Sequence, residues 1–274
     1  MTASLPLSRR ECALLLATLV LLLAALLGPA VPAHALAFGA FADLRGWHGI
    51  PNAMDVLSNL PFAALGLWGL WRLRRFDAAW HATAPAAEPP GSTLDCAWLF
   101  FAGLLVTAAG SAFYHLQPDT LRLAADRAGM AVAFAGLVGL AVCERVSQRA
   151  GWAMAWVMLT GGLLAAACGS EADNLLPWGI VQFGGMALVL VLALTPRVPG
   201  ALGLRLGAVI ALYGAAKLFE LGDHWLYEAS GHFVSGHTLK HGVAALAAMP
   251  VLAALGAVGR QGLRHNPGAA AATA

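Results

Sequence analysis

Residues 236–258 read GHTLKHGVAALAAMPVLAALGAV, an apolar run that opens with two histidines four residues apart. On an α-helix, His237 and His241 lie on one face, one turn apart. With this spacing a helix presents two imidazole nitrogens to one metal ion. The run is also long enough to cross the hydrocarbon layer of a membrane, which takes about 20 residues. The stretch therefore predicts a metal site at the start of a membrane-spanning helix.

A second polar stretch lies far upstream, at the end of another apolar run. Residues 110–115 read GSAFYH, so Ser111 and His115 share a helix face one turn apart. Asp126 follows early in the next apolar run. We expect Ser111, His115 and Asp126 to meet the histidines of residues 236–241 around a shared ion inside a helix bundle.

The composition indicates an integral membrane protein. Of the 274 residues, 59% are hydrophobic and 11% are charged, whereas a soluble domain has about 25% charged residues. The formal net charge of +2 is too small to argue for nucleic-acid binding. The four cysteines are dispersed without a CxxC pair, so they predict neither a disulfide framework nor a thiolate zinc site.

The apolar runs predict an all-α, polytopic membrane protein with a seven-transmembrane-helix bundle in residues 38–258. Read at about 20 residues each, the predicted helices cover residues 54–73, 95–117, 121–143, 151–169, 176–195, 202–222 and 236–258. Residues 1–37 fit a signal peptide or one extra N-terminal transmembrane helix equally well. Residues 76–94 are expected to form a flexible loop, and residues 259–274 a disordered cytoplasmic tail.

The basic residues predict the orientation of this bundle. With seven alternating helices, one side carries Arg72, Arg74, Arg75, Arg145, Arg149, Arg197, Arg205, Arg260 and Arg264. The positive-inside rule assigns that side to the cytoplasm. The candidate site then lies toward the periplasmic side of a bacterial inner membrane. A solvated rim is expected around it, formed by Glu171, Asp173, Asn174, Glu220, Asp223, His224, Glu228 and His232.

The candidate residues suit hydrolysis of an amide or an ester. Three histidines leave one position of a tetrahedral zinc site open, which is typical of catalytic zinc. Zinc lowers the pKa of a bound water toward about 7, and Asp126 is expected to accept the proton of that water. Ser111 is expected to donate a hydrogen bond to the developing oxyanion or to orient the water. The location inside a membrane bundle favours a lipid substrate.

Three other interpretations stay open from the residues alone. In the first, Asp126 pairs with Arg122 or Arg127, and Ser111 bonds to its own helix. In the second, the bundle is a receptor-like or structural protein in which zinc only links helices to one another. A haem site is the least favoured, because His237 and His241 share a helix face and cannot bracket one haem from opposite sides.

The combined pattern resembles the CREST superfamily, which includes alkaline ceramidases and progestin/adiponectin-type receptors. The similarity covers residues 38–258 and is greatest to the bacterial alkaline phytoceramidase-like branch. It rests on FADLRGWHGIPNAMDVLSNLPFAALG, GSAFYHLQPDTLRLAADRAGMAVAF, AKLFELGDHW and SGHTLKHGVAAL.

The resemblance implies a ceramidase-like activity. It implies that His115, His237 and His241 bind Zn²⁺ and that Asp126 and Ser111 lie beside the bound water. The implied substrate is a ceramide-like lipid amide, cleaved to a long-chain base and a fatty acid. Eukaryotic alkaline ceramidases also carry a calcium site in a D-W-x-E-x-N stretch, and the segment from Asp43 to His48 lacks that pattern. We therefore expect Asp43, Asn52 and Asp55 to cap or brace the first core helix.

Overall fold

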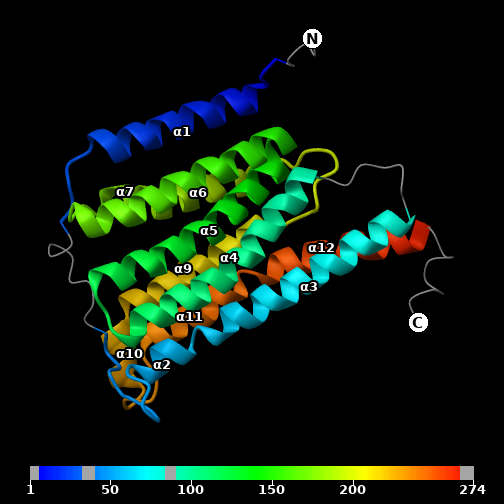
Figure 1. The fold of residues 1–274 in the computed structure, drawn as a ribbon. Coiled ribbons are helices and arrows are strands. Elements are labelled where there is room, and N and C mark those ends of the chain that lie inside the picture. The colour runs from blue at the N-terminus through cyan, green and yellow to red at the C-terminus, as the bar shows by residue number, and fades with distance from the viewer. Residues whose placement is uncertain (1–5, 33–40, 84–90, 266–274) are drawn as a thin grey trace.

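The structure, a computed structural model, describes residues 6–32, 41–83 and 91–265, and these residues form helices and connecting segments with no β-strand among them. The helices are α1 Arg9–Leu27, α2 Ala53–Leu57, α3 Leu60–Thr83, α4 Gly91–Leu116, α5 Thr120–Arg145, α6 Gln148–Glu171, α7 Leu176–Gly179, the π-helical turn η2 Ile180–Gly184, α8 Gly185–Ala193, α9 Leu206–Leu221, α10 Asp223–Ala229, α11 Gly236–Leu246 and α12 Met249–His265. The predicted all-α fold is confirmed for the described residues (Figure 1).

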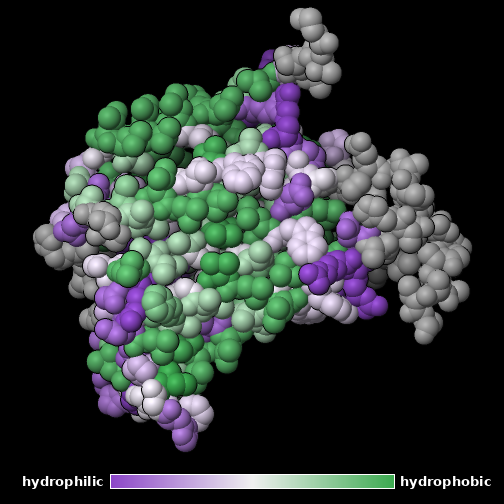
Figure 2. Space-filling model, viewed as in Figure 1, coloured by the Kyte–Doolittle hydropathy of each residue, from purple (hydrophilic) through white to green (hydrophobic). Residues whose placement is uncertain are grey.

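Seven helical spans within the described chain are long and apolar enough to cross a membrane. They are Arg9–Leu27, Ala53–Asp77, Gly91–Leu116, Thr120–Arg145, Gln148–Gly169, Leu176–Ala193 and Gly236–Ala257. These spans include the N-terminal α1 and leave out α9. With 16 residues, α9 extends about 24 Å, less than the roughly 30 Å of hydrocarbon that a straight span covers. Hydrophobic side chains cover much of the face seen in Figure 2, and hydrophilic ones gather toward its two ends.

Two predicted boundaries were wrong, and one helix is broken. α3 continues to Thr83, so helix occupies part of the expected loop 76–94, and α12 continues to His265, inside the expected disordered tail. Residues 84–90 and 266–274 lie outside the described residues. The predicted helix 236–258 is interrupted between α11 and α12. Pro250 explains the interruption, because its ring has no N–H to donate and clashes with the preceding helical turn.

The bundle has two distinct ends (Figure 1). At one end, Arg10 Nη1 donates to the carbonyl oxygen of Arg145 at 2.7 Å, and Arg149 Nε donates to Glu11 at 2.7 Å. We call this the basic end, and the C-terminal end of α12 lies there too. The short helices α2 and α10 lie at the opposite end. Arg10, Arg145 and Arg149 therefore gather at one end, while the assignment of that end to the cytoplasm stays a prediction.

Helices α4 and α5 pack backbone to backbone along a row of glycines. A Cβ atom at Gly110 would lie 2.6 Å from the carbonyl oxygen of Ala125, and one at Gly103 would lie 2.4 Å from the backbone nitrogen of Ala133. Such distances are possible only without a side chain, as in the small-residue contacts between membrane helices. The glycine seam consists of Gly103, Gly110, Gly129 and Gly136. It sets the register between the end of α4 and the start of α5.

The non-helical segment 194–205 replaces the turns that α9 lacks. Glu144, in α5, is fully buried, and its Oε2 accepts hydrogen bonds from the backbone N–H groups of Gly203 at 3.2 Å and Leu204 at 3.0 Å. Irregular backbone at membrane depth is tolerated where it is buried in protein and its polar groups are paired. One carboxylate thus holds the entry to α9 against α5.

Candidate metal centre

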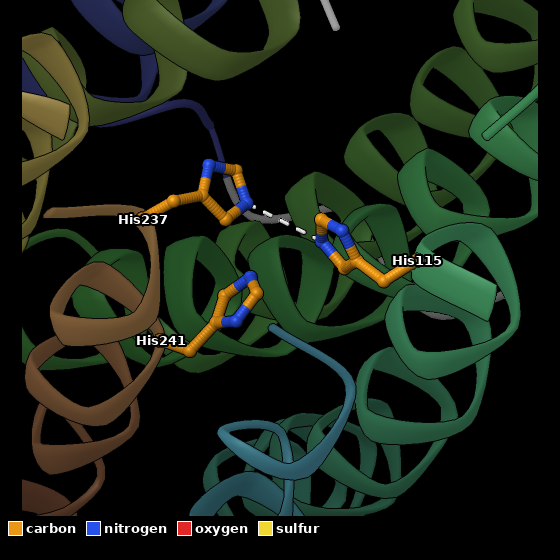
Figure 3. Close-up of side chains that lie close together, drawn as sticks. All are labelled: His115, His237 and His241. Carbon is orange, nitrogen blue, oxygen red and sulfur yellow. Dashed lines mark hydrogen bonds between the residues drawn. The ribbon is translucent and has the colours of Figure 1, made fainter. Parts of the chain in front are cut away.

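Three histidine rings converge at the end of the bundle opposite the basic end (Figure 3). His115 lies in the last turn of α4, and His237 and His241 lie in the first two turns of α11. One nitrogen from each ring lies within 4.8 Å of the other two. The three residues are 1%, 8% and 4% exposed, so bulk water does not cover them. The prediction that these three histidines form one cluster that could bind a metal ion is confirmed.

The distance between two of the three rings fits a tetrahedral ion. Nε2 of His115 lies 3.3 Å from Nε2 of His237. A tetrahedral zinc ion with Zn–N bonds of 2.0–2.1 Å holds its nitrogen ligands about 3.3 Å apart. Three neutral imidazoles suit zinc, copper, nickel or iron, so the geometry supports a metal site without selecting the metal.

A serine fixes the orientation of His241. The hydroxyl of Ser58 donates to the carbonyl oxygen of Asp55 at 3.0 Å and lies 2.7 Å from Nδ1 of His241. Because the single proton of Ser58 goes to that carbonyl, Nδ1 of His241 must donate to Ser58. Nε2 of His241 then carries the free lone pair, as a metal ligand requires, and such partners commonly set the tautomer of a ligating histidine.

The first turn of α11 is anchored by a buried carboxylate. Oδ1 of Asp223 accepts the backbone N–H of His237 at 2.7 Å, and Oδ2 accepts that of Ala42 at 3.0 Å. Asp223 is 8% exposed, so its expected place in a solvated rim was wrong. Its negative charge lies at the positive end of the α11 dipole, where it stabilises the helix. Sequence reasoning missed this role, because Asp223 lies 14 residues from the backbone N–H that it accepts.

Residues before α3 brace the same site. Nδ2 of Asn52 donates to the carbonyl oxygen of His115 at 2.8 Å, and the hydroxyl of Thr238 donates to Oδ1 of Asp55 at 2.9 Å. The ring of Phe41 packs edge-on against His115 and His237, with centroids 4.8 and 4.7 Å apart. Asn52 and Asp55 therefore brace α4 and α11, the two helices that carry the histidines. The predicted cap of the first core helix is not made by Asn52, whose side chain forms no cap hydrogen bond with α2.

Ser111 and Asp126 lie on the two helices joined by the glycine seam. Ser111 is buried one turn before His115 in α4, and its hydroxyl lies near the carboxylate of Asp126 in α5. The alternative pairing with Arg122 does not occur, because Arg122 pairs with Asp119 at 3.4 Å. The structure thus brings Ser111 and Asp126 together, and their catalytic roles stay a prediction.

An ion cluster joins α9 to α11 beside the histidines. Glu220 accepts Nζ of Lys217 at 2.5 Å and Nζ of Lys240 at 2.9 Å. All three side chains are between 19% and 31% exposed, so Glu220 belongs to this cluster and not to a freely solvated rim. Lys240 stands between the two histidines of α11 in the sequence, and that position was the signal that could have found it.

A small apolar cavity lies about one helical turn from the residues of the site. Its volume is about 90 Å³, and its lining includes Thr107, Met130, Ala244 and Phe62. Thr107 precedes Ser111 by one helical turn, Met130 follows Asp126 by one turn, and Ala244 follows His241 by about one turn. The ring of Phe62 lies 6.3 Å from that of His241. The cavity therefore lies directly beneath the polar cluster.

No protein-family model matches the chain, and no curated protein matches it. The resemblance to the CREST superfamily accordingly rests on the residues quoted above. The chemistry of the site has to be derived from its own geometry.

Proposed function

We propose that the chain is a zinc-dependent intramembrane hydrolase of the CREST superfamily. It cleaves the amide bond of a ceramide-like lipid and releases a long-chain base and a fatty acid. The observation that carries this proposal is the convergence of three buried imidazoles, from α4 and α11, on one point. Ser111 and Asp126 accompany them on α4 and α5, and a purely structural site has no need of a base.

Different residues of the chain have different roles in the proposed hydrolysis. His115, His237 and His241 would hold the zinc ion, which when bound supplies a water of lowered pKa and polarises a carbonyl. Asp126 accepts a proton as the carbonyl carbon is attacked and returns it to the departing amine. Ser111 donates a hydrogen bond to the oxygen on which negative charge develops. Lys240 and Glu220 hold α11 against α9 and so keep His237 and His241 in place.

The surroundings of the site support a lipid substrate. An apolar cavity lies about one helical turn from the polar cluster, and seven of the described helical spans have membrane length and composition. A hydrocarbon chain next to the cleaved bond gains about 0.8 kcal/mol for each buried methylene. We place the site toward the periplasmic side of a bacterial inner membrane and the C-terminus in the cytoplasm, because Arg10, Arg145 and Arg149 gather at the other end.

The test is a measurement of metal and product on the same preparation. We expect the full chain, purified in detergent, to contain one zinc ion per chain and to release fatty acid from a ceramide. His237→Ala should lose both the zinc and the activity. The matched control is His232→Ala, which removes an exposed imidazole that pairs with Glu228 and should change neither. Fatty-acid release by metal-free His237→Ala would overturn the proposal.

A structural zinc site is the alternative, and the contact between His115 and His237 favours it as well. That contact links α4 to α11, two helices that are far apart in the sequence. In this alternative, removal of zinc lowers the melting temperature, while no amide lipid in a broad panel is cleaved by the zinc-loaded protein. Cleavage of any member of the panel that depends on the three histidines excludes it.

A further inference from the structure

Thr107 carries a buried hydroxyl that makes no hydrogen bond within the described chain. The residue is 6% exposed and lines the cavity beneath the metal centre. A buried, unpaired hydroxyl destabilises a fold by about 1–3 kcal/mol. In native proteins such a group calls for a specific explanation.

Three other threonines of the same protein bond back to the preceding helical turn. The hydroxyls of Thr18, Thr160 and Thr195 each donate to the carbonyl oxygen four residues earlier, at 2.8, 2.8 and 3.0 Å. This is the usual arrangement for threonine inside a helix. Thr107 lies in the middle of α4 and makes no such bond. Its hydrogen-bonding capacity is therefore unused within the described chain, at a residue that lines the cavity.

The position of Thr107 determines where on a bound lipid that group would lie. Thr107 lies four residues before Ser111, about 6 Å along the helix axis. In the proposed reaction the cleaved carbonyl lies at the level of Ser111. Two or three covalent bonds followed by a hydrogen bond of about 2.8 Å cover this distance. A hydroxyl on the second or third carbon of the acyl chain would therefore reach Thr107.

The size of the cavity agrees with such a short reach. An apolar cavity of about 150 Å³ holds a six-carbon ring, so one of about 90 Å³ has room for about three or four carbons. The lining is otherwise apolar apart from Tyr213, whose hydroxyl also lacks a hydrogen-bond partner in the described chain. Of these two hydroxyls, that of Thr107 lies on α4, the helix that carries Ser111 and His115.

We propose that Thr107 forms a subsite for a hydroxyl group on the second or third carbon of the acyl chain, so that the enzyme prefers amides of hydroxylated fatty acids. The inference rests on the proposed function, which places the acyl carbonyl beside Ser111. It adds a determinant of substrate choice that the metal centre itself does not supply. One hydrogen bond between neutral groups contributes about 0.5–1.5 kcal/mol, which corresponds to a preference of about two- to twelvefold.

The experiment measures binding and hydrolysis separately. Binding of three free fatty acids of equal length, carrying no hydroxyl, a 2-hydroxyl or a 3-hydroxyl, is measured on the zinc-loaded full chain in detergent. The same three acyl groups are then presented as amides of one long-chain base. Thr107→Val removes the hydroxyl and keeps the shape, Thr107→Ser retains the hydroxyl, and Thr160→Val is the control on the exposed face of α6. The zinc content of each variant reports whether the site is intact.

We expect the wild type, Thr107→Ser and Thr160→Val to favour one hydroxylated acid, and Thr107→Val to bind all three acids equally. Equal binding of the three acids by the wild type would overturn the subsite even when ceramides are cleaved. A preference that Thr107→Val retains would overturn it as well. A preference that Thr107→Val abolishes, without cleavage of any amide, would support the subsite and contradict the proposed hydrolase activity.

Discussion

The hydroxyl oxygen of Ser58 lies 2.7 Å from Nδ1 of His241 and directs the other ring nitrogen toward His115 and His237. Ser58→Ala removes the group that selects this tautomer, so zinc affinity should fall about 10- to 100-fold. A competition titration with a chelator on detergent-purified protein measures the change. Thr160→Ala is the control, because its hydroxyl bonds to carbonyls of its own helix. Unchanged affinity in Ser58→Ala would show that the ring is held by packing alone.

The roles proposed for Asp126 and Ser111 predict loss of activity without loss of metal. Asp126→Asn keeps the shape of the side chain and removes the base, and we expect the rate to fall about 10²- to 10⁴-fold. Ser111→Ala removes a hydrogen-bond donor to the oxyanion, with an expected loss of about 10²- to 10³-fold. Zinc content and fatty-acid release are measured on the same samples. A variant that retains the full rate would remove its residue from the mechanism.

The close packing of α4 and α5 at the glycine seam predicts that one methyl group added there disturbs the nearby site. In Gly110→Ala the added carbon would lie 2.6 Å from the carbonyl oxygen of Ala125, so α4 and α5 must separate. Overpacking of this kind destabilises a protein by about 1–3 kcal/mol. We expect a lower melting temperature together with reduced hydrolysis.

The control for Gly110→Ala is another helical glycine with free space around it. A Cβ atom at Gly161, in α6, would meet nothing within 4 Å. Gly161→Ala should leave hydrolysis unchanged and stabilise the helix by up to about 1 kcal/mol. Equal effects of the two substitutions would contradict the proposed importance of the seam.

The pairing of the buried Asp43 with the exposed Arg45 predicts a loss of stability at low pH. Burial alone would raise the pKa of Asp43, but two hydrogen bonds from Arg45, at 2.8 and 2.6 Å, and its positive charge lower that pKa below its usual value. A carboxyl whose pKa is lowered in the folded state stabilises the fold above its unfolded pKa of about 3.9 and loses this contribution as the pH falls further.

Melting temperatures of the wild type and of Asp43→Asn between pH 6 and pH 3 test this prediction. We expect the wild type to be the more stable at pH 6 and the difference to shrink below about pH 4, as Asp43 becomes protonated. A difference that stays constant over the whole range would show that Asp43 contributes through packing and not through its charge.

The convergence of the histidines could be predicted because each motif shows on a single helix. The spacing of His237 and His241 defines a face, and the alternation of apolar runs places His115 at the same end of the bundle. Ser58 and Asp223 could not be predicted in the same way. Their hydrogen bonds join segments 183 and 14 residues apart, and neither separation leaves a periodic pattern in the sequence.

The length of α9 and the break in the last predicted helix were missed for different reasons. Residues 202–204 read Leu-Gly-Leu, so composition cannot distinguish them from a helical turn, although they belong to the non-helical segment that Glu144 binds. The break between α11 and α12 could have been predicted from Pro250, which lies inside the apolar run. It was missed because the residues on both sides of Pro250 have the apolar composition of one continuous membrane span.

Glu144 also affects how many times the chain is expected to cross the membrane. A tally of membrane-length helices gives seven, an odd number, which would assign the two termini to opposite compartments. Adding the short α9, whose missing turns are replaced by the stretch that Glu144 holds, gives eight passages through the bundle. An even number returns the chain to the side where it began, so reporter fusions at residues 1 and 274 should give the same readout.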